Sequence, residues 1–227
     1  MTEREVITRA YDEGAQREYA RLVQSPLHEA EWSLIIDLID EYIACESVVV
    51  DIGAGPGRYA EYLLKQRNCQ VGLVDLSEEC LALFTSRIGA SHRERVKFTW
   101  KSCATDLSWI PEASFNTALL MGPLYHLVTE QERKKAVAEA LRILVPGGFV
   151  FATFISCYPV FSRILTHEPS LLHDEKFLDN LLNQGMVFAK DGISSMTDHF
   201  RCWPQQARLM METSGFETIR MRNLEGV

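Results

Sequence analysis

The stretch SVVVDIGAGPGRYAEYLLKQRN, residues 47–68, decides the fold of this 227-residue chain. Its first part is a short β-branched run, which is typical of a strand buried on both faces of a sheet. Glycines then stand at positions 53, 55 and 57, and a helical pattern follows them directly. Strand, glycine turn and helix in this order often form a ligand-binding turn, although a glycine turn alone is equally compatible with an ordinary tight turn.

The same alternation of strand and helix continues along the chain from this stretch. Short apolar runs separated by amphipathic segments indicate parallel strands joined by helices. The expected helices downstream cover residues 58–66, 77–88, 129–148 and 204–215, and the expected strands cover 47–53, 70–77, 95–102, 114–122, 149–156 and 216–224. The sequence therefore predicts an α/β fold, with a three-layer, Rossmann-like and mostly parallel sheet and helices on both faces.

Two segments lie outside this alternation. Residues 1–45 have the pattern of an N-terminal helical cap, with apolar side chains at helical spacing between positions 32 and 43. Residues 158–201 combine aromatic and charged side chains with one expected helix at 174–185, and we interpret them as an insertion or lid over one end of the sheet. Because no linker-like stretch separates these parts, residues 1–227 are expected to form a single domain.

Composition argues against several classes of function. The formal net charge is −8, and binding to a nucleic acid favours a basic surface, so no nucleic-acid partner is expected. The six cysteines form no C-x-x-C pair and no metal-ligand cluster with histidine, so no metal site is expected. Scattered thiols without a signal peptide predict a cytoplasmic location, and no apolar run is long enough for a membrane span.

The residues around the glycine turn restrict the kind of ligand. Asp75 ends the second expected strand, 22 positions after Gly53, where a carboxylate can reach the two hydroxyls of a ribose. Arg58 stands where the dinucleotide fingerprint has its third glycine, and Asp51 adds negative charge beside any diphosphate. A ligand with a ribose but no phosphates fits better, although an NAD(P)-dependent oxidoreductase would share this strand–turn–helix start.

Several segments, taken in their order along the chain, resemble the class I S-adenosylmethionine-dependent methyltransferases. They are VVVDIGAGPG (48–57), VGLVDLS (71–77), ASFNTALLMGPLYHL (113–127), LRILVPGGFVFATF (141–154) and FRCWPQQARLMMETSGFETI (200–219). The resemblance covers nearly the whole chain, and the joint order is far more specific than any one motif. The turn MGPLYHL is most similar to bacterial enzymes that methylate small molecules, the ubiquinone/menaquinone-methyltransferase-like group.

The resemblance implies S-adenosylmethionine as the cofactor, S-adenosylhomocysteine as the product, and methyl transfer to an O, N, S or C atom of a small molecule. It places Gly53 and Gly55 under the methionyl part of the cofactor, and Asp51 against the loop or the cofactor's amino group. Asp75 would bind the ribose hydroxyls. The implied cofactor-binding residues are Tyr11, Arg21, Asp51, Gly53, Ala54, Gly55, Asp75, Leu76, Cys103, Ala104, Met121 and Gly122.

One departure from the family pattern lies on the adenine side. Many relatives carry an acidic residue where Cys103 stands, and a thiol is a poor substitute for a carboxylate that accepts from the adenine amine. The backbone N–H of Ala104 could still bind the ring nitrogen. This departure keeps open a second hypothesis, a non-catalytic protein that has the methyltransferase fold and binds S-adenosylmethionine or S-adenosylhomocysteine.

The candidate catalytic residues are His126 and Tyr125, in the turn after the fourth expected strand. His126 would act as a general base or contact the substrate, or else it is a histidine at a helix start that bonds only to backbone. Tyr125 would contact the substrate or only pack. Tyr11 would close over the cofactor and Arg21 would pair with its methionyl carboxylate, unless both are surface helix residues. His199 could reach the pocket from the 158–201 segment.

The C-terminal region departs from the family pattern as well. The family sheet has a seventh, antiparallel strand, and this chain ends directly after the expected sixth strand, so the seventh strand is expected to be missing. Unpaired strand edges tend to associate. We therefore expect either a homodimer that pairs through residues 216–224 or a monomer in which this strand is poorly ordered.

Overall fold

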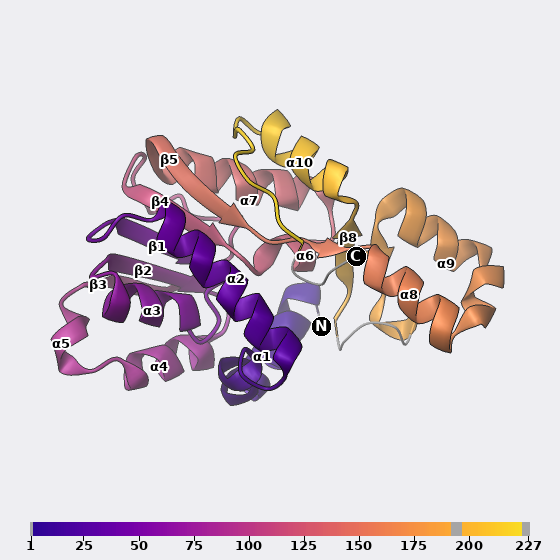
Figure 1. Cartoon of the computed structure of the whole chain (residues 1–227), viewed down its shortest axis with the longest axis horizontal. Coiled ribbons are helices and arrows are strands. Elements are labelled where there is room, and N and C mark those ends of the chain that lie inside the picture. Colours follow the sequence, from indigo (N-terminus) through magenta and orange to yellow (C-terminus); the bar gives the residue numbers. More distant parts are fainter. Residues whose placement is uncertain (1, 192–196, 224–227) are drawn as a thin grey trace.

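The computed structural model describes residues 2–191 and 197–223 and contains a central parallel sheet between two layers of helices (Figure 1). The sheet order is β3-β2-β1-β4-β5. Its strands are β1 (Val48–Ile52), β2 (Gln70–Asp75), β3 (Val96–Lys101), β4 (Phe115–Leu120) and β5 (Leu144–Ala152). The predicted α/β fold class is confirmed, and the order reverses between β1 and β4, which creates a topological switch point.

Each face of the sheet packs against its own set of helices. The first face, with Val50, Ile52 and Leu120, packs against α7 (Glu130–Ile143) and α10 (Pro204–Thr213). The second face, with Val49 and Leu73, packs against the other main helices. These are α2 (Pro26–Tyr42), α3 (Arg58–Gln66) and α4 (Glu78–Arg87). Because both faces are covered, the strands can be apolar throughout, as the β-branched run at the start of β1 predicted.

Side-chain caps fix the starts of two helices, α1 (Glu3–Arg21) and α4. Helix α1 begins at Thr2, whose hydroxyl and the Glu5 side chain form a capping box. Helix α4 begins after Ser77, whose Oγ accepts a hydrogen bond from the Cys80 N–H. The short helices are α5 (Ala90–Arg93) and α6 (Pro123–His126). Helix α6 follows β4 at the switch point, and this places its side chains beside the glycine turn.

A small separate unit follows β5 directly. It pairs the short strands β6 (Ile155–Ser156), β7 (Met186–Val187) and β8 (His199–Cys202) in the order β6-β8-β7. Its helices are α8 (Tyr158–His167) and α9 (Glu175–Asp179), with a π-helical turn at Asn180–Gln184 and 3₁₀ turns at Pro169–His173 and Ala189–Asp191. This orange unit lies beside the main sheet (Figure 1).

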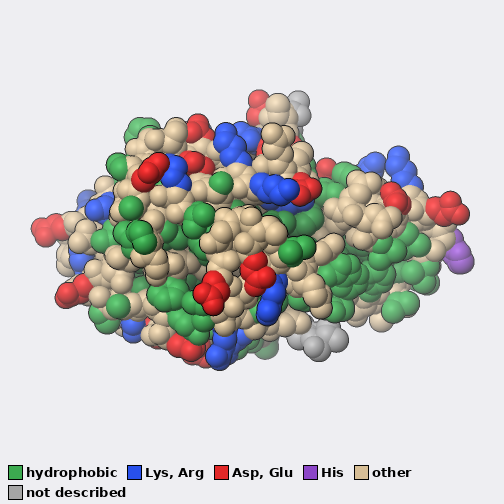
Figure 2. Space-filling view, turned by 90° about the horizontal axis from the view of Figure 1, so that it is seen from above, with side chains coloured by type: hydrophobic (Ala, Val, Ile, Leu, Met, Phe, Trp, Pro, Cys, Tyr) green, Lys and Arg blue, Asp and Glu red, His purple; other side chains and the backbone are tan. Residues whose placement is uncertain are grey.

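The small unit has an apolar core of its own and an apolar surface. Its core contains Val160, Ile164, Phe177, Leu181 and Val187. Figure 2 shows apolar side chains gathering over this part of the molecule, whereas both signs of charge are scattered over the main sheet. The exposed apolar residues of the unit include Leu165, Leu172 and Leu182.

The boundary between α7 and β5 differs from the sequence prediction. The expected helix ran to residue 148, but α7 ends at Ile143 and β5 begins at Leu144. The pairing of β4 with β5 shifts register here, from Phe115 with Leu144 to Thr117 with Phe149. The Pro-Gly-Gly segment therefore lies in a bulge of β5 rather than at a helix end.

The prediction of a sixth strand at 216–224 is wrong for the described residues, because residues 216–223 form no strand. The segment alternates apolar residues with Glu217, Arg220 and Arg222, and both Ile219 and Met221 remain exposed. A strand of this kind needs a neighbour for its backbone hydrogen bonds, and none is paired with it here. Among the residues that the structure describes, no strand follows β8.

Candidate active site

The glycine turn between β1 and α3 forms the base of the site. Gly53, Gly55 and Gly57 all have positive φ, at 71°, 54° and 72°. A Cβ on Gly53 would lie 2.4 Å from the Cγ of Pro123, and a Cβ on Gly57 would lie 2.4 Å from the ring of Phe84. Gly55 faces open space instead. Packing therefore requires glycine at 53 and 57, whereas Gly55 leaves room for a ligand.

Asp75, at the end of β2, braces this turn. Its Oδ2 accepts a hydrogen bond from the Gly55 N–H at 2.7 Å, and its Oδ1 accepts one from the Ser77 N–H at 2.8 Å. Burial raises the pKa of this carboxyl, and the backbone N–H groups oppose that shift. Each carboxylate oxygen can accept a second bond, so Asp75 can hold the turn and still accept from a ligand hydroxyl.

Asp51, in β1, lies beside Asp75 and is 3% exposed. Within the described part of the chain its Oδ2 is buried and has no hydrogen-bond partner. Burial, together with the negative charge of Asp75, raises the pKa of Asp51 to about 7. A buried carboxylate without a partner is costly, and a cationic group in the cavity would stabilise its charged form.

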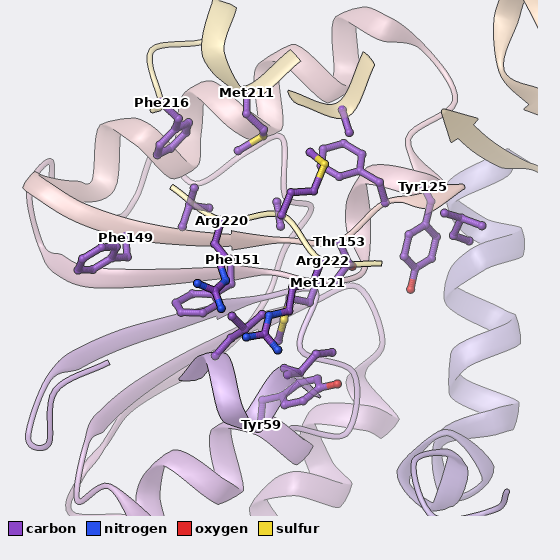
Figure 3. A pocket seen from close by; sticks show the side chains of 18 of the residues that line it. Tyr59, Met121, Tyr125, Phe149, Phe151, Thr153, Met211, Phe216, Arg220 and Arg222 are labelled. Atoms are coloured by element: carbon purple, nitrogen blue, oxygen red, sulfur yellow. The ribbon is translucent and has the colours of Figure 1, made fainter. Parts of the chain in front are cut away.

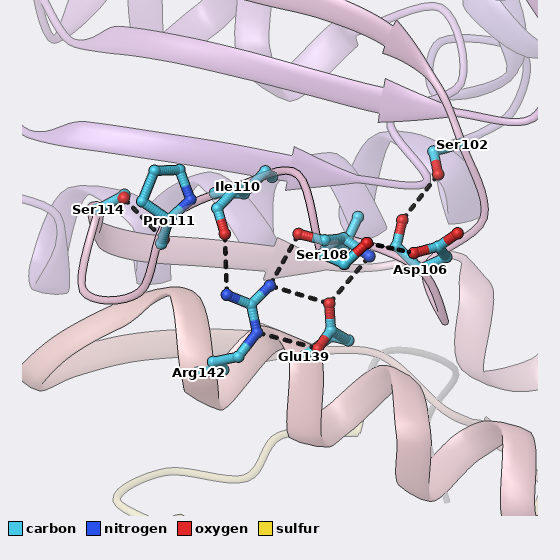
Figure 4. Close-up of polar contacts among 9 residues, drawn as sticks. Ser102, Asp106, Ser108, Ile110, Pro111, Ser114, Glu139 and Arg142 are labelled. Carbon is cyan, nitrogen blue, oxygen red and sulfur yellow. Dashed lines mark hydrogen bonds and ion pairs between the residues drawn. The ribbon is translucent and has the colours of Figure 1, made fainter.

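The loop after β3 is the part of the site where the resemblance placed the adenine. Thr105 Oγ1 lies 3.2 Å from the Cys103 sulfur, and both residues are buried. Two side chains of α7 hold this loop from below (Figure 4). Arg142 donates to the carbonyls of Leu107 and Ile110, at 2.7 and 2.8 Å, and Glu139 accepts from the Leu107 N–H at 2.9 Å. The loop is therefore fixed to α7 by three hydrogen bonds.

Helix α1 covers the carboxyl ends of the strands. Ser77 Oγ donates to Asp12 Oδ1 at 2.5 Å, which joins α1 to the start of α4. On the opposite side, Tyr11 Oη lies 2.8 Å from Nε2 of His126. The helix is thus attached at both sides of the cavity beneath it, and Tyr11 connects the N-terminal segment to the turn after β4.

His126 belongs to a group of buried rings. Its ring centroid lies 4.7 Å from that of Tyr125 and 5.0 Å from that of His199, which comes from β8 of the small unit. Burial lowers the pKa of His126 to about 3, and nearby His199 adds to this effect. Burial also lowers the pKa of His199 to about 4. Both imidazoles are therefore neutral at pH 7, as a general base must be.

Arg21 has partners of its own at the end of α1. Its guanidinium contacts Glu18 at 2.8 Å and forms two hydrogen bonds to Glu31, at 2.8 and 3.2 Å. Burial opposes the charge of Arg21, but these two carboxylates outweigh it and raise its pKa. A ligand carboxylate at this position would therefore compete with Glu18 and Glu31.

The predicted cofactor-binding and catalytic residues line one cavity of about 130 Å³, whereas His199 lines the larger cleft described below. They are Tyr11, Arg21, Asp51, Gly53, Ala54, Gly55, Asp75, Leu76, Cys103, Ala104, Met121, Gly122, Tyr125 and His126. A larger cleft of about 1180 Å³ adjoins it, and the two share a wall that includes Tyr59, Met121 and Tyr125 (Figure 3). A donor bound in the cavity and an acceptor bound in the cleft would therefore meet at this wall.

The sequence interpretation missed several residues that line the cavity. Glu3, Arg4, Ile7 and Thr8 of α1 belong to this group, as do Pro123 and Glu132. Tyr59 was missed as well, although its place next to the glycine turn could have indicated it. The α1 residues carried no comparable signal, because nothing in the helical pattern shows which part of the chain the helix covers.

The family comparison agrees with this geometry. Residues 49–148 match the family model described as a methyltransferase domain, and they run from β1 into β5. This part of the chain, which is less than half of its length, is therefore similar to the class of methyltransferase domains. The match favours this class over an NAD(P)-dependent oxidoreductase.

Two curated relatives carry methyltransferase names. A candidate methyltransferase from Encephalitozoon cuniculi is 29% identical over 146 residues, which is 64% of this chain and 60% of the relative. A tRNA (carboxymethyluridine(34)-5-O)-methyltransferase from Arabidopsis thaliana is 28% identical over 124 residues, which is 55% of this chain. The chain spans less than two thirds of the first relative and only 28% of the second.

A solved structure shares most of the fold. The S-adenosylmethionine-dependent methyltransferase from Methanosarcina mazei aligns with a TM-score of 0.63 and 18% sequence identity. The alignment covers 79% of this chain and 84% of that protein, so it supports the fold. Within the described residues, no helix is long and apolar enough to cross a membrane, and no group of three or more acidic, histidine or cysteine side chains could hold a metal ion.

Proposed function

We propose that this chain transfers a methyl group from S-adenosylmethionine to a small-molecule acceptor. The observation that carries the proposal is the shared wall between the cofactor cavity and the larger cleft, formed by Tyr59, Met121 and Tyr125. Bound S-adenosylmethionine supplies an electrophilic methyl group on its sulfonium. The chain then has to orient the acceptor in line with that methyl and exclude water.

The residues of the cavity fit this cofactor. The unpartnered Oδ2 of Asp51 suits a cationic ligand group such as the cofactor's amino group. Asp75 retains acceptor capacity for ribose hydroxyls, and the open space at Gly55 admits a ligand close to the backbone. Leu76, Cys103 and Ala104 would line the adenine. Arg21 would pair with the methionyl carboxylate of the cofactor after releasing Glu18 or Glu31.

His126 is proposed as the general base for an acceptor that carries a proton. Its Nε2 is now engaged by the Tyr11 hydroxyl, so an acceptor hydroxyl would have to replace Tyr11 or pass its proton through it. Burial keeps His126 neutral at pH 7 but also makes it a weak base, so a bound acceptor would have to raise the pKa of His126 for the proton to be transferred. Helix α1, which carries Tyr11, would also exclude water from the reacting atoms.

A nucleic-acid acceptor is the main alternative, because one relative is a tRNA methyltransferase. The net charge of −8 weighs against it, since binding to RNA depends strongly on cationic side chains. We therefore favour a small molecule, in a subgroup similar to the ubiquinone/menaquinone methyltransferases. A non-catalytic protein that only binds the cofactor is the other alternative, and Cys103 is the residue that motivates it.

Isothermal titration with S-adenosylmethionine and S-adenosylhomocysteine tests the proposal most directly. We expect saturable binding of both, and a loss of at least tenfold in affinity for Asp75→Asn. Lys97→Gln, on the outer strand β3, is a matched control outside both cavities and should bind normally. Failure of the folded wild-type protein to bind either compound would overturn the proposal, and saturable NADH binding would favour an oxidoreductase instead.

A further inference from the structure

The larger cleft has an apolar floor that leads to the shared wall. Strand β5 contributes Phe149 and Phe151, and Phe154 follows directly after it. Figure 3 shows Phe151, Met121 and Tyr59 grouped below the C-terminal coil, with Tyr125 at one end. An apolar body bound on this floor would have its reactive end near Tyr125 and His126. The floor alone would suit many apolar molecules.

Basic side chains cover this apolar floor. Arg208 of α10 and both Arg220 and Arg222 of the C-terminal coil line the cleft. Figure 3 shows the guanidinium groups of Arg220 and Arg222 pointing from the coil toward the sheet. These two residues lie two positions apart on the same coil, and both line the same cleft.

The ion pairs of the cleft leave these arginines largely without partners. Arg220 has one distant contact with Glu41, at 4.0 Å, and no ion pair or hydrogen bond is formed by Arg222 among the described residues. Three carboxylates also line the cleft, against five arginines: Glu18 and Glu31 are paired with Arg21, and Glu217 lies on the same coil as Arg220 and Arg222. A protein of net charge −8 therefore has a locally positive cleft entrance, and this attracts anions.

We propose that the acceptor site takes an anionic amphipathic small molecule, and this inference rests on the proposed methyltransferase function. Its apolar body would lie on Phe149, Phe151 and Met121. Its acid group, a carboxylate, sulfonate or phosphate, would bind Arg222 and Arg220 at the entrance. The nucleophilic atom would then lie at the opposite end, at the wall shared with the cofactor cavity. A guanidinium is suited to such groups because it forms paired hydrogen bonds.

Dye binding tests the charge preference without knowledge of the natural acceptor. The anionic probe is 8-anilinonaphthalene-1-sulfonate, and the neutral probe of similar shape is N-phenyl-1-naphthylamine. We expect saturable binding of both dyes to the full chain. Arg220→Gln combined with Arg222→Gln should weaken the anionic dye about tenfold and change the neutral dye less than twofold. Arg220→Lys with Arg222→Lys should retain most of the anionic affinity.

Matched controls separate this inference from the proposed function. Lys134→Gln changes one exposed charge outside the cleft and should leave both dyes unchanged. All variants should bind S-adenosylhomocysteine like the wild type, because neither arginine lines the cofactor cavity. Equal losses for both dyes, or an anionic affinity that is insensitive to the arginines, would overturn the inference. Displacement of the anionic dye by bulk tRNA at 150 mM salt would overturn it in favour of a nucleic acid.

Discussion

At the scale of single residues, the site combines buried groups whose pKa values move in ways that favour their uncharged forms. Burial raises the pKa of Asp51 to about 7 and lowers those of His126 and His199 to about 3 and 4. The resemblance implied Asp51, just before the glycine turn, as a site residue, and the place of His126 after β4 made it the candidate base. The sequence could not predict these shifts, because they depend on burial beneath α1 and on His199, which approaches from a distant strand.

Asp51→Asn should remove one pH dependence of stability. The folded pKa of Asp51 is raised from 3.8 to about 7, so its contribution is fully present below about pH 4 and is lost as pH rises through 7. The loss amounts to a few kcal/mol, since one pKa unit corresponds to about 1.4 kcal/mol. Urea unfolding of the cofactor-free protein at pH 5 and pH 8 measures it. We expect the variant to lose less stability than the wild type between these two values, and equal losses would contradict the assignment.

The two histidines act in the opposite direction. Their folded pKa values lie below the ordinary 6.5, so their contribution is present above pH 6.5 and is lost as pH falls toward 4 and 3. In ¹⁵N spectra both imidazoles should therefore remain neutral from pH 8 down to pH 5. Protonation of His126 near pH 6.5 would contradict the burial-induced shift assigned to this residue.

At the scale of elements, the glycine turn offers a matched pair of substitutions. Gly53→Ala adds a Cβ at 2.4 Å from Pro123 in a conformation that already disfavours side chains, so we expect a loss of more than about 3 kcal/mol of unfolding free energy. Gly55→Ala meets nothing closer than 4.0 Å and should cost only about 1–2 kcal/mol. Its methyl group would still enter the cofactor cavity.

Thermal unfolding and cofactor titration of both variants measure this difference. Gly55→Ala should fold and bind S-adenosylhomocysteine more weakly. The main effect of Gly53→Ala should instead be a lower unfolding temperature. If Gly55→Ala folded and bound with wild-type affinity, the open space at Gly55 could not be the ligand side of the turn. The sequence predicted a ligand turn, but it could not distinguish the glycine that faces the ligand from those required by packing.

The contact between α7 and the loop after β3 gives another prediction at this scale. Arg142→Gln removes the guanidinium that donates to the carbonyls of Leu107 and Ile110. We expect a loss of about 1–2 kcal/mol, because two partly buried carbonyls lose a charged donor. Cofactor affinity should also fall, since Cys103 and Ala104 lie in this loop. Lys134→Gln on the same helix is the control. Equal stability of the two variants would show that the hydrogen bonds of Arg142 do not stabilise the loop.

Elements fail to be predictable where their structure depends on a neighbour. The first five strands were predictable because each carries its own apolar pattern and lies between helices. Residues 216–223 carry a weaker alternating pattern, and they remain a coil that is not paired with the free edge of β5. The bulge at the start of β5 was hidden for a related reason, since it is set by register with β4.

At the scale of the whole molecule, the site collects residues from distant parts of the chain. The switch point between β1 and β4 provides the glycine turn and His126. Helix α1 covers the cavity, and the small unit contributes His199. The parallel topology made the first of these predictable, because all strands end at the same edge. No such rule predicts where α1 and the small unit pack, so their contacts with the site could be found only in the folded structure.

The outer edge of β5 leads to a prediction about the whole molecule. Strand β5 is an edge strand whose only neighbour within the described residues is β4, and exposed edges of parallel sheets tend to associate. We expect a monomer at about 1 µM and reversible homodimers at about 100 µM by light scattering. Hydrogen exchange should show added protection in β5 at the higher concentration, while residues 216–223 exchange rapidly in the monomer. A monomer with strong protection across 216–223 would contradict this, because it would mean that the segment pairs within its own chain.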